Sequence, residues 1–259
     1  ALPVYAYYGY GQWMVSQNAE ALAKYEIGFD VDSARDLLIK AGYTYNEDGK
    51  LYEDGKQQVR CHIKKGRLTP LELRWAKTPG QASELLLRQL TDACAKLGIR
   101  LTVTDMSFAD MLHQYFRVDG AREYNLFFLT ETFFFAFDPY NAYNADDVWQ
   151  GAVNTSGLRD ERLMAAARAM RRVPSGDMEA FAAKWFKFQD RWREVMPTAP
   201  IYSNVYFDLC VPTLYEFSAN VRFGLSYALL YTTLVKPPEA SALDAGGLMG
   251  SDLEVVVEK

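Results

Sequence analysis

The residue types that do most enzyme chemistry are few and scattered in this sequence. There are three cysteines, Cys61, Cys94 and Cys210, and no pair of them has the spacing of metal ligands or forms a disulfide framework. Only two histidines, His62 and His113, are present, so a zinc site of usual composition is hard to assemble. We expect Cys94, on the apolar side of a predicted helix, to be a small core residue, and we expect no metal or other cofactor.

The motifs of the common α/β enzymes are also missing. The sequence contains no GxGxxG after a strand, no phosphate loop, no Gly-x-Ser-x-Gly elbow and no paired His-Cys arrangement. Adjacent carboxylates such as Asp146 and Asp147 seldom converge on one substrate, which favours a solvated loop. The two Glu-Asp-Gly repeats within 46–56 lack the ligand pattern of a calcium loop and indicate tight hairpin turns. We therefore expect a binding protein, with an α/β enzyme that lacks a recognisable motif as an alternative.

The charge and hydrophobicity patterns argue against two further classes of protein, those that bind nucleic acid and those that span a membrane. The net charge is -5 and both signs are mixed along the chain, whereas a nucleic-acid surface needs clustered Lys and Arg. The short run Arg168, Arg171 and Arg172 falls at a predicted helix end, where cations interact favourably with the helix dipole. No apolar run is long enough to span a membrane.

Hydrophobic periodicity predicts a strand–helix–strand unit in the first half of the chain. Apolar residues alternate at 71–75 and again at 99–103, which indicates two strands. Between them, a helix begins after Thr78-Pro79, carries an apolar stripe that includes Leu86 and Leu90, and ends at Gly98. This is the size of a βαβ unit, so the two strands should be parallel.

Other elements follow from caps and apolar spacing. Asp32 is the predicted cap of a helix that Gly42 ends, and Ser107 is the predicted cap of another. The apolar run 124–129 predicts a strand buried on both faces. Further predictions are a helix at 159–172, an aromatic-striped helix at 176–195 packed on the sheet, a strand at 201–207, a linker at 237–250 and an edge strand at 253–257. No period is evident in 1–29.

Several short motifs, taken in order, match one known family. The stretch Asp32–Tyr43 resembles the A-x-x-L-L-x-x-A-G-Y helix of the oligopeptide/dipeptide-binding family of solute-binding proteins, and the Asp-Gly turns after it also match. Further matches occur in the family's order at Leu97–Ile99, Phe108, Glu123–Leu126, Asp138–Pro139, Asn154–Met164 and Ala199–Tyr202. The resemblance covers residues 32–205.

The resemblance implies a fold, a role and a location. The fold would be an α/β, periplasmic-binding-protein-like (type II) lobe with a mixed, mainly parallel sheet flanked by helices. Residues 1–31 would be a segment from the inter-lobe region, 32–215 the ligand-binding lobe, and 216–259 a segment and tail belonging to the first lobe. The protein would capture peptides outside the cytoplasm for an ABC importer, closing on them like jaws. An alternative is the solute-sensing lobe of a transcriptional regulator.

The resemblance also implies partners. Family members are roughly twice as long, so this chain would be a C-terminal lobe that works with an N-terminal lobe and with an ABC permease in the membrane. Its ligand would be a peptide or peptide-like small solute, and no nucleic acid is implied.

The ligand-facing segment should follow the strand at 124–129. Aromatic side chains there would line a pocket and polar ones would place the ligand. The residues predicted to contact ligand are Phe108, His113, Thr130, Glu131, Thr132, Phe133, Phe135, Asp138, Tyr140 and Asn141. An alternative is that Phe133 to Phe135 are ordinary core, since successive strand residues face opposite sides. Peptide-binding members place an Asp near Phe135 to pair with the peptide amine, and Glu131 could substitute for it.

Overall fold

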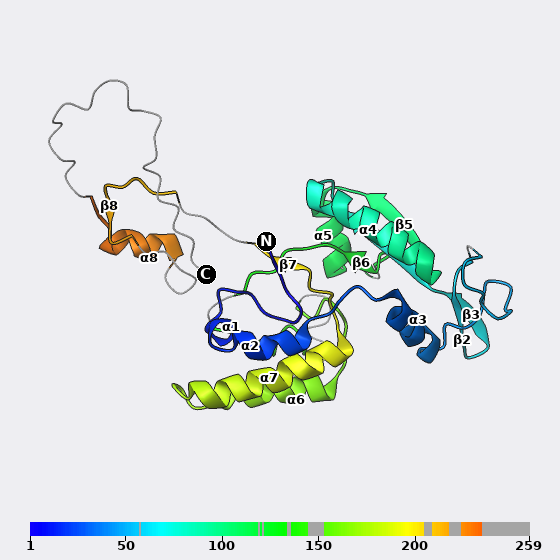
Figure 1. Ribbon diagram of the computed structural model, residues 1–259, viewed down its shortest axis with the longest axis horizontal. Coiled ribbons are helices and arrows are strands. Elements are labelled where there is room, and N and C mark those ends of the chain that lie inside the picture. The colour runs from blue at the N-terminus through cyan, green and yellow to red at the C-terminus, as the bar shows by residue number, and fades with distance from the viewer. Residues whose placement is uncertain are drawn as a thin grey trace, which may run out of the picture. The chain divides into compact units, whose positions relative to one another are not determined.

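The computed structural model describes residues 1–56, 58–118, 120, 122–133, 136–144, 153–204, 209–217 and 224–234 (Figure 1). The contacts divide the chain into two compact units. Unit 1 consists of the described residues within Ala1–Glu26, Thr132–Asp138 and Ala165–Lys259, and unit 2 of those within Ile27–Glu131 and Pro139–Met164. The chain therefore passes between the units at four points, two of which flank the segment 132–138.

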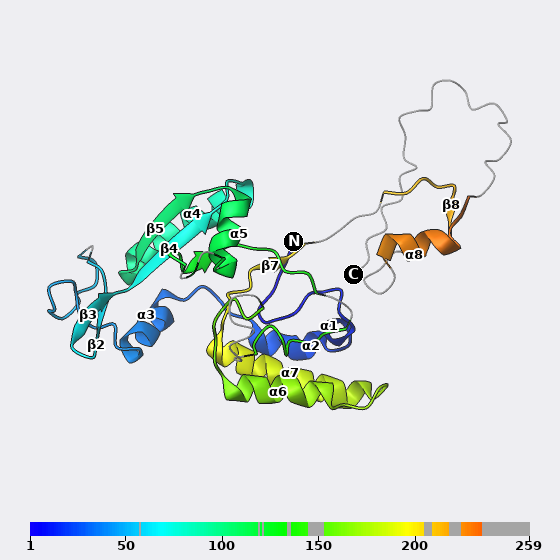
Figure 2. The same cartoon turned by 180° about the vertical axis from the view of Figure 1, so that it is seen from behind.

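Unit 2 contains a three-stranded parallel sheet. Its strands are β4 (Glu72–Lys77), β5 (Arg100–Asp105) and β6 (Leu126–Phe127), in the order β5-β4-β6. The helix α4 (Gln81–Leu97) connects β4 to β5, and Figures 1 and 2 show it running along these two strands. The predicted parallel pair is confirmed, with Trp75 opposite Val103 on one side and Leu126 on the other.

The strand predicted at 124–129 is shorter and more exposed than expected. Only Leu126 and Phe127 pair with β4, and both are half-buried. The prediction of a strand buried on both faces is therefore wrong. The physical reason is position, because β6 lies at the edge of the sheet, whereas the central strand β4 holds the fully buried Trp75 and Ala76.

Local signals define most helix ends in unit 2. The αL conformation of Gly98 (φ +68°) ends α4 as expected, and the Ser107 hydroxyl accepts a hydrogen bond from the Asp110 amide at the start of α5 (Phe108–Phe116). The helix α3 (Val31–Lys40) is different, because its cap is Asp30 rather than the predicted Asp32. The carboxylate of Asp30 accepts from the Ser33 amide at 2.9 Å. A capping side chain bonds the amide three residues on, which Asp30 does here.

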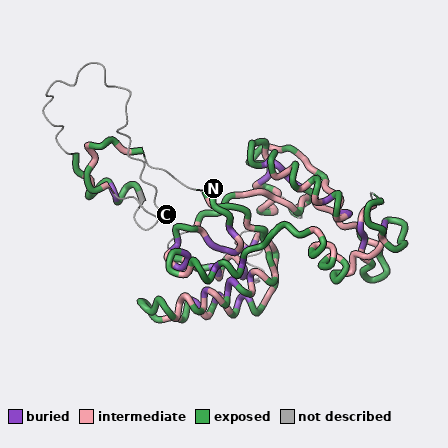
Figure 3. The backbone as a smooth tube through the Cα atoms, in the orientation of Figure 1, coloured by how far each residue is buried: buried purple, intermediate pink, exposed green. Residues whose placement is uncertain are grey.

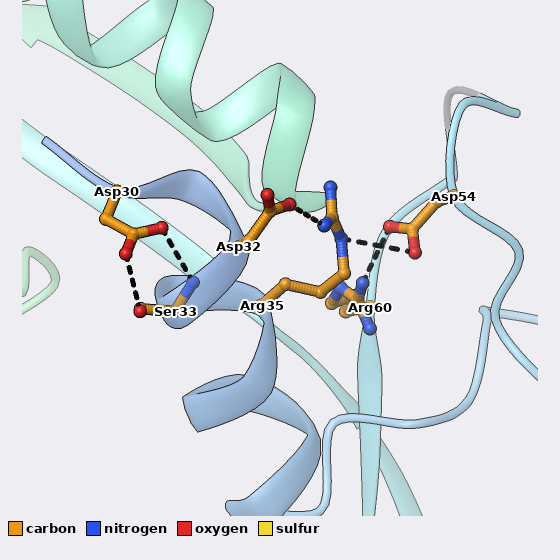
Figure 4. Close-up of polar contacts among 6 residues, drawn as sticks. All are labelled: Asp30, Asp32, Ser33, Arg35, Asp54 and Arg60. Atoms are coloured by element: carbon orange, nitrogen blue, oxygen red, sulfur yellow. Dashed lines mark hydrogen bonds and ion pairs between the residues drawn. The ribbon is translucent and has the colours of Figure 1, made fainter.

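The helix α3 buries none of its side chains, and an ion pair connects it to the loop before β2. Figure 4 shows the Asp54 carboxylate between two arginines, 3.3 Å from Nε of Arg35 and 2.8 Å from Nη2 of Arg60. Arg60 is buried, stacks over the Tyr52 ring at 3.9 Å, and donates to the carbonyl of Leu97 at 2.9 Å. This buried guanidinium thus connects the loop before β2 to the end of α4.

Two hairpin features lie between α3 and β4. The predicted Asp-Gly turn forms, with the Asn46 Oδ1 atom accepting from the Asp48 and Lys50 amides, and Tyr45 bridges to Leu51. A second hairpin, β2 (Cys61–Lys64) and β3 (Arg67–Pro70), was not predicted. Its turn is Lys65-Gly66, at φ +50° and +75°, which is the backbone that a two-residue hairpin turn requires.

Unit 1 is built on two helices and the N-terminal residues. The helices are α6 (Glu161–Arg171), whose last seven residues belong to this unit, and α7 (Met178–Val195), and they run beside each other in both views (Figures 1 and 2). The predicted inward residues of α6, Leu163, Ala167 and Met170, are buried. The N-terminal residues form β1 (Leu2–Pro3), α1 (Trp13–Gln17), α2 (Ala19–Leu22) and a 3-10 turn at Ala23–Tyr25.

The aromatic stripe of α7 has a different partner from the one predicted. Trp185, Phe188 and Trp192 are fully buried. Figure 3 shows that buried positions alternate with half-buried and exposed ones along α7. The three buried side chains pack on N-terminal residues instead of a sheet. The Tyr7 ring stacks on Trp192 at 5.5 Å, and Tyr8 lies 6.2 Å from Trp185. The prediction of packing on a sheet is therefore wrong, because this unit contains only two-stranded pairs among its described residues.

The remaining described elements are short. The strand β7 (Tyr202–Ser203) pairs with β1, and β8 (Leu214–Tyr215) pairs with β9 (Thr233–Leu234). Between β8 and β9 lies α8 (Gly224–Tyr231). The predicted linker at 237–250 and edge strand at 253–257 lie outside the described residues. Across the described parts, no helix has the length and apolar character needed to cross a membrane.

Candidate functional site

The carboxyl edge of the sheet in unit 2 is the natural place for a site. The connection after β4 leads to β5, on one side of β4, and the connection after β5 leads to β6, on the other side of β4. The crevice outside the carboxyl ends of such diverging strands is where open α/β sheets bind ligands. Three segments meet this edge: 78–80 after β4, 106–108 after β5 and 128–131 after β6.

Lys77, the last residue of β4, organises this edge. Its side chain is only 3% exposed, and its Nζ lies 2.7 Å from Oδ1 of Asp105 and 2.5 Å from Oε1 of Glu84. Hydrogen bonds to these two carboxylates, that of Asp105 first, raise the pKa of Lys77 above its ordinary value. The ammonium therefore joins the end of β4 to the end of β5 and to the first turn of α4. Sequence reasoning missed Lys77, although a lysine that ends a buried strand is itself a signal of a buried ion pair.

The helices that begin at this edge have well-defined first turns. The buried Ser83 hydroxyl donates toward the carbonyls of Thr78 and Gly80, at 2.8 and 2.9 Å, and fixes the loop into α4. The predicted contact Phe108 is the first residue of α5 and is 59% exposed. His113 is exposed in the last turn of α5, which runs away from this edge toward the start of β6.

The segment after β6 begins in unit 2 and continues into unit 1. Thr130 and Glu131 are exposed and follow the carboxyl end of β6, and Thr132, also exposed, is the first residue of unit 1. Phe133 is half-buried, and its ring meets the Tyr7 ring edge-on at 5.0 Å. Phe133 also lies against Gly9, where an added Cβ atom would be 3.1 Å from the phenyl ring. The predicted contact Phe135 lies outside the described residues.

An ion pair holds the end of this segment in unit 1. Asp138 accepts hydrogen bonds from Arg171, at 2.9 and 3.0 Å from Nε and 2.6 Å from Nη2. This two-pronged geometry is the strong form of an arginine–carboxylate pair. Arg171 lies in the last turn of α6, so it meets a specific carboxylate in addition to the helix dipole. Asp138 is thereby placed as a support of the segment.

Two more predicted residues return to unit 2. Tyr140 is half-buried and Asn141 is exposed, and the carbonyl of Asn141 accepts from the Asn144 amide at 3.4 Å. Unit 2 therefore carries six of the ten predicted contacts and unit 1 carries three of the described ones. Those of unit 2 are Phe108, His113, Thr130, Glu131, Tyr140 and Asn141, and those of unit 1 are Thr132, Phe133 and Asp138.

The chemistry available at these positions is that of recognition. Hydroxyl, amide, carboxylate and aromatic groups can hydrogen-bond and enclose a small molecule. Within the described residues, no group of three or more His, Cys, Asp or Glu side chains is placed to hold a metal ion. Cys61 and Cys94 are buried thiols whose pKa values are raised, mainly by burial, as expected for core residues.

Comparison with known proteins identifies this fold. No family model matches the sequence, and no curated protein matches it. Solved structures do match: the oligopeptide-binding protein AppA of Bacillus subtilis, in complex with a nonapeptide, has a TM-score of 0.54 at 14% identity, over 86% of this chain and 45% of its own. The oligopeptide-binding protein of Thermus thermophilus, complexed with a pentapeptide, has a TM-score of 0.53 at 17% identity, over 78% of this chain and 34% of its own.

A third structure, NikA of Brucella suis in complex with Fe(III)-EDTA, has a TM-score of 0.52 at 17% identity and covers 78% of this chain and 36% of its own. These identities are low, so the likeness shows a shared fold. The α/β fold with a parallel sheet is confirmed, and it is similar to the fold of these three proteins. The chain spans less than half the length of each of these three proteins.

Proposed function

We propose that this chain forms the ligand-binding, C-terminal lobe of an extracytoplasmic solute-binding protein that captures peptides for an ABC importer. The observation that carries the proposal is the fold similarity, over 78% to 86% of the chain, to proteins whose structures contain a nonapeptide, a pentapeptide or a metal chelate. The role is capture and delivery, so the protein is a binding protein and performs no covalent chemistry.

An N-terminal lobe would be the first partner, and an exposed apolar surface in unit 1 supports this. Monomeric proteins rarely expose large contiguous apolar patches without an interaction to explain them. On and around α8, nine large apolar side chains are more than half exposed: Leu209, Val211, Tyr215, Leu225, Tyr227, Leu229, Leu230, Tyr231 and Leu234. We assign this surface, named the α8 surface, to contact with the N-terminal lobe. The closed protein would then be recognised by an ABC permease.

The ligand would be a peptide or peptide-like small solute held at the carboxyl edge of the sheet. Phe108 supplies an exposed aromatic surface there, and Thr130 and Glu131 supply polar groups close to the end of β6. Tyr140 and Asn141 add a phenol and an amide from the same unit. Extended peptides are bound mainly through their backbone, which such groups can serve. The exposed carboxylate of Glu131 is the proposed partner of the peptide's free amine.

Peptide affinity tests the lobe assignment. Titration calorimetry of the 259-residue chain with a pentapeptide should give a dissociation constant weaker than micromolar, because a lobe alone lacks half of the contacts and must still offset the entropy cost of association. The longer polypeptide encoded with its upstream sequence should bind at micromolar affinity or better. Micromolar binding by the chain alone would contradict the lobe assignment.

The upstream coding sequence separates this proposal from the regulator alternative. A signal peptide with a lipid-attachment cysteine supports transport, whereas a winged helix supports a transcriptional regulator. Formation of a chemical product from any bound solute would contradict the binding role.

The role of Glu131 has its own test in the longer polypeptide. Glu131→Gln should remove the preference for a free-amine peptide over its N-acetylated form, while Glu123→Gln, at another exposed glutamate of unit 2, should keep it. An unchanged preference in Glu131→Gln would mean that the amine pairs elsewhere.

A further inference from the structure

A buried asparagine closes the turn 153–158 in unit 2. Asn154 is 0% exposed, and its side-chain amide makes four hydrogen bonds. Its Nδ2 donates to the carbonyls of Asn144 at 3.1 Å and Leu158 at 2.9 Å, and its Oδ1 accepts from the Ser156 hydroxyl at 2.9 Å and the Gly157 amide at 3.1 Å. This satisfies both donors and both acceptor sites of the amide. The orientation of the side chain is therefore fully determined by its surroundings.

The same turn is attached to the sheet through its next residue. The Thr155 hydroxyl donates to the Tyr115 hydroxyl at 2.6 Å, and Nη2 of Arg122 donates to the Thr155 carbonyl at 2.7 Å. The Arg122 guanidinium lies 5.4 Å from the centre of the Phe127 ring, and the Tyr115 ring lies 5.5 Å from it. Phe127 is the last residue of β6. The turn therefore has a fixed position relative to the carboxyl end of that strand.

The other side of Asn154 meets the segment that carries two proposed ligand contacts. Asn144 is buried, and its backbone carbonyl accepts from the Asn154 side chain. The backbone amide of Asn144 donates to the backbone carbonyl of Asn141. Pro139 and Tyr143 in this segment are also buried, so its backbone is packed in place while Asn141 stays exposed. A continuous series of contacts thus runs from Phe127 through the turn to Asn141.

From this geometry we infer that Asn154 is a positioning residue for ligand binding. It sets the place of Tyr140 and Asn141 relative to Thr130 and Glu131, which continue β6. The inference rests on the proposed function and adds to it a residue that does not touch the ligand. If Asn154 served stability alone, its substitution would lower the melting temperature, and peptide binding would fall only in proportion to the loss of folded protein.

The chain contains a control for this asparagine at an exposed position, Asn125. Asn125 also bridges two backbone groups, since its Nδ2 donates to the Glu72 carbonyl at 3.0 Å and its Oδ1 accepts from the Arg74 amide at 2.8 Å. It lies at the opposite, amino edge of the sheet, away from the segment 139–144. In both cases, Asn→Asp keeps the shape and the accepting oxygen, removes the N–H donors, and places a carboxylate oxygen beside carbonyl oxygens.

The experiment compares Asn154→Asp with Asn125→Asp in the 259-residue chain. Amide hydrogen exchange reports on the amides of 140–144, and NMR titration with millimolar pentapeptide reports on Tyr140 and Asn141. Asn154→Asp should speed exchange in this segment by about tenfold and weaken the peptide response by a similar factor, as expected for lost hydrogen bonds to a buried carbonyl. Asn125→Asp should leave both unchanged.

Two results would overturn the inference. One is unchanged exchange at 140–144 in Asn154→Asp, and the other is an equal loss of peptide response in both variants. If the wild-type chain alone gives no response to millimolar pentapeptide, the same titration is made in the longer polypeptide, where a wild-type protein without any response would contradict the proposed function and leave the exchange difference between the variants in place. If Asn154→Asp does not fold, Asn154→Ser provides the same comparison, since serine is too short to reach the Asn144 carbonyl and adds no charge.

Discussion

Gln189 is the side chain whose loss should affect unit 1 most. It is fully buried on α7, and its amide pairs twice with the backbone of Tyr7: the Tyr7 amide donates to Oε1 at 2.9 Å, and Nε2 donates to the Tyr7 carbonyl at 2.7 Å. Gln189→Leu keeps the approximate size of the side chain but removes both hydrogen bonds to this buried backbone. Each hydrogen bond lost at a buried polar group costs about 1–3 kcal/mol, so the free energy of unfolding should fall by roughly 2–6 kcal/mol.

This loss is a large share of the stability of an ordinary domain, which is about 5–15 kcal/mol. It should also reach the proposed ligand segment, because the Tyr7 ring packs on Phe133 at 5.0 Å and on Phe137 at 5.7 Å. We therefore expect faster exchange of the Phe133 and Phe137 amides in Gln189→Leu, together with faster exchange along α7.

Hydrogen exchange at several urea concentrations is the suitable measurement, because it resolves the two units separately. The amides of β4 and β5 in unit 2 are an internal reference and should keep their protection. Gln17→Leu, at an exposed glutamine of α1 in the same unit, is the matched control and should change stability by less than about 0.5 kcal/mol. A change that small in Gln189→Leu, or an equal loss of protection in β4 and β5, would refute the reasoning.

Three more predictions follow from single residues. Burial raises the pKa of Tyr8 from 10.0 to about 12, so the folded state holds the phenolic proton more tightly than the unfolded state does. This contributes stability on the order of 2 kcal/mol, which is complete below pH 10 and is lost as the pH rises toward 12. In a plot of the urea unfolding midpoint against pH, Tyr8→Phe should therefore flatten the fall between pH 10 and about 12. Gly98→Ala should lower the free energy of unfolding by about 1–3 kcal/mol by calorimetry, because φ is +68° and the added Cβ atom would collide with the Tyr52 hydroxyl; an unchanged stability would show that α4 ends in another way. Cys210 is half-buried and stands between Leu209 and Val211 of the α8 surface, so it should be alkylated faster than the buried Cys94 in this chain and be protected in the longer polypeptide. Equal labelling of Cys210 in both proteins would contradict a lobe interface there.

The parts of the fold that sequence predicted well are those set by local chemistry. The unit from β4 to β5 has alternating strands, an apolar helical stripe and a glycine stop, and each of these acts over a few residues. The Ser107 cap and the αL conformation of Gly98 were predictable for the same reason. Asp30 and Asp32 show the limit of such reasoning. Both are capping residue types two positions apart, and only the backbone decides which of them becomes the cap; here it is Asp30, which accepts from the Ser33 amide.

Contacts between distant segments were not predictable in this way. The stripe on α7 identified a helix with a buried face, but its sequence does not name the surface opposite. That surface is the N-terminal segment around Tyr7, which shows no strand or helix period and lies 182 residues from Gln189. An aromatic helix face is equally suited to a sheet and to a cluster of tyrosines, so periodicity alone could not choose between them.

The candidate site depends on distant contacts even more strongly. Alternation tells which side chains share a face only while the chain remains a strand, and β6 ends at Phe127. Beyond Phe127, contacts with residues far away in the sequence decide where each side chain lies. Phe133 is placed by Tyr7, and Asp138 by Arg171. The turn of Asn154 and Thr155 meets Arg122 and Tyr115, which are 33 and 40 residues away from Thr155. The resemblance in sequence therefore supplies the segment only as a proposed site, while the conformation of each residue within it follows from polar and aromatic partners that no local pattern encodes.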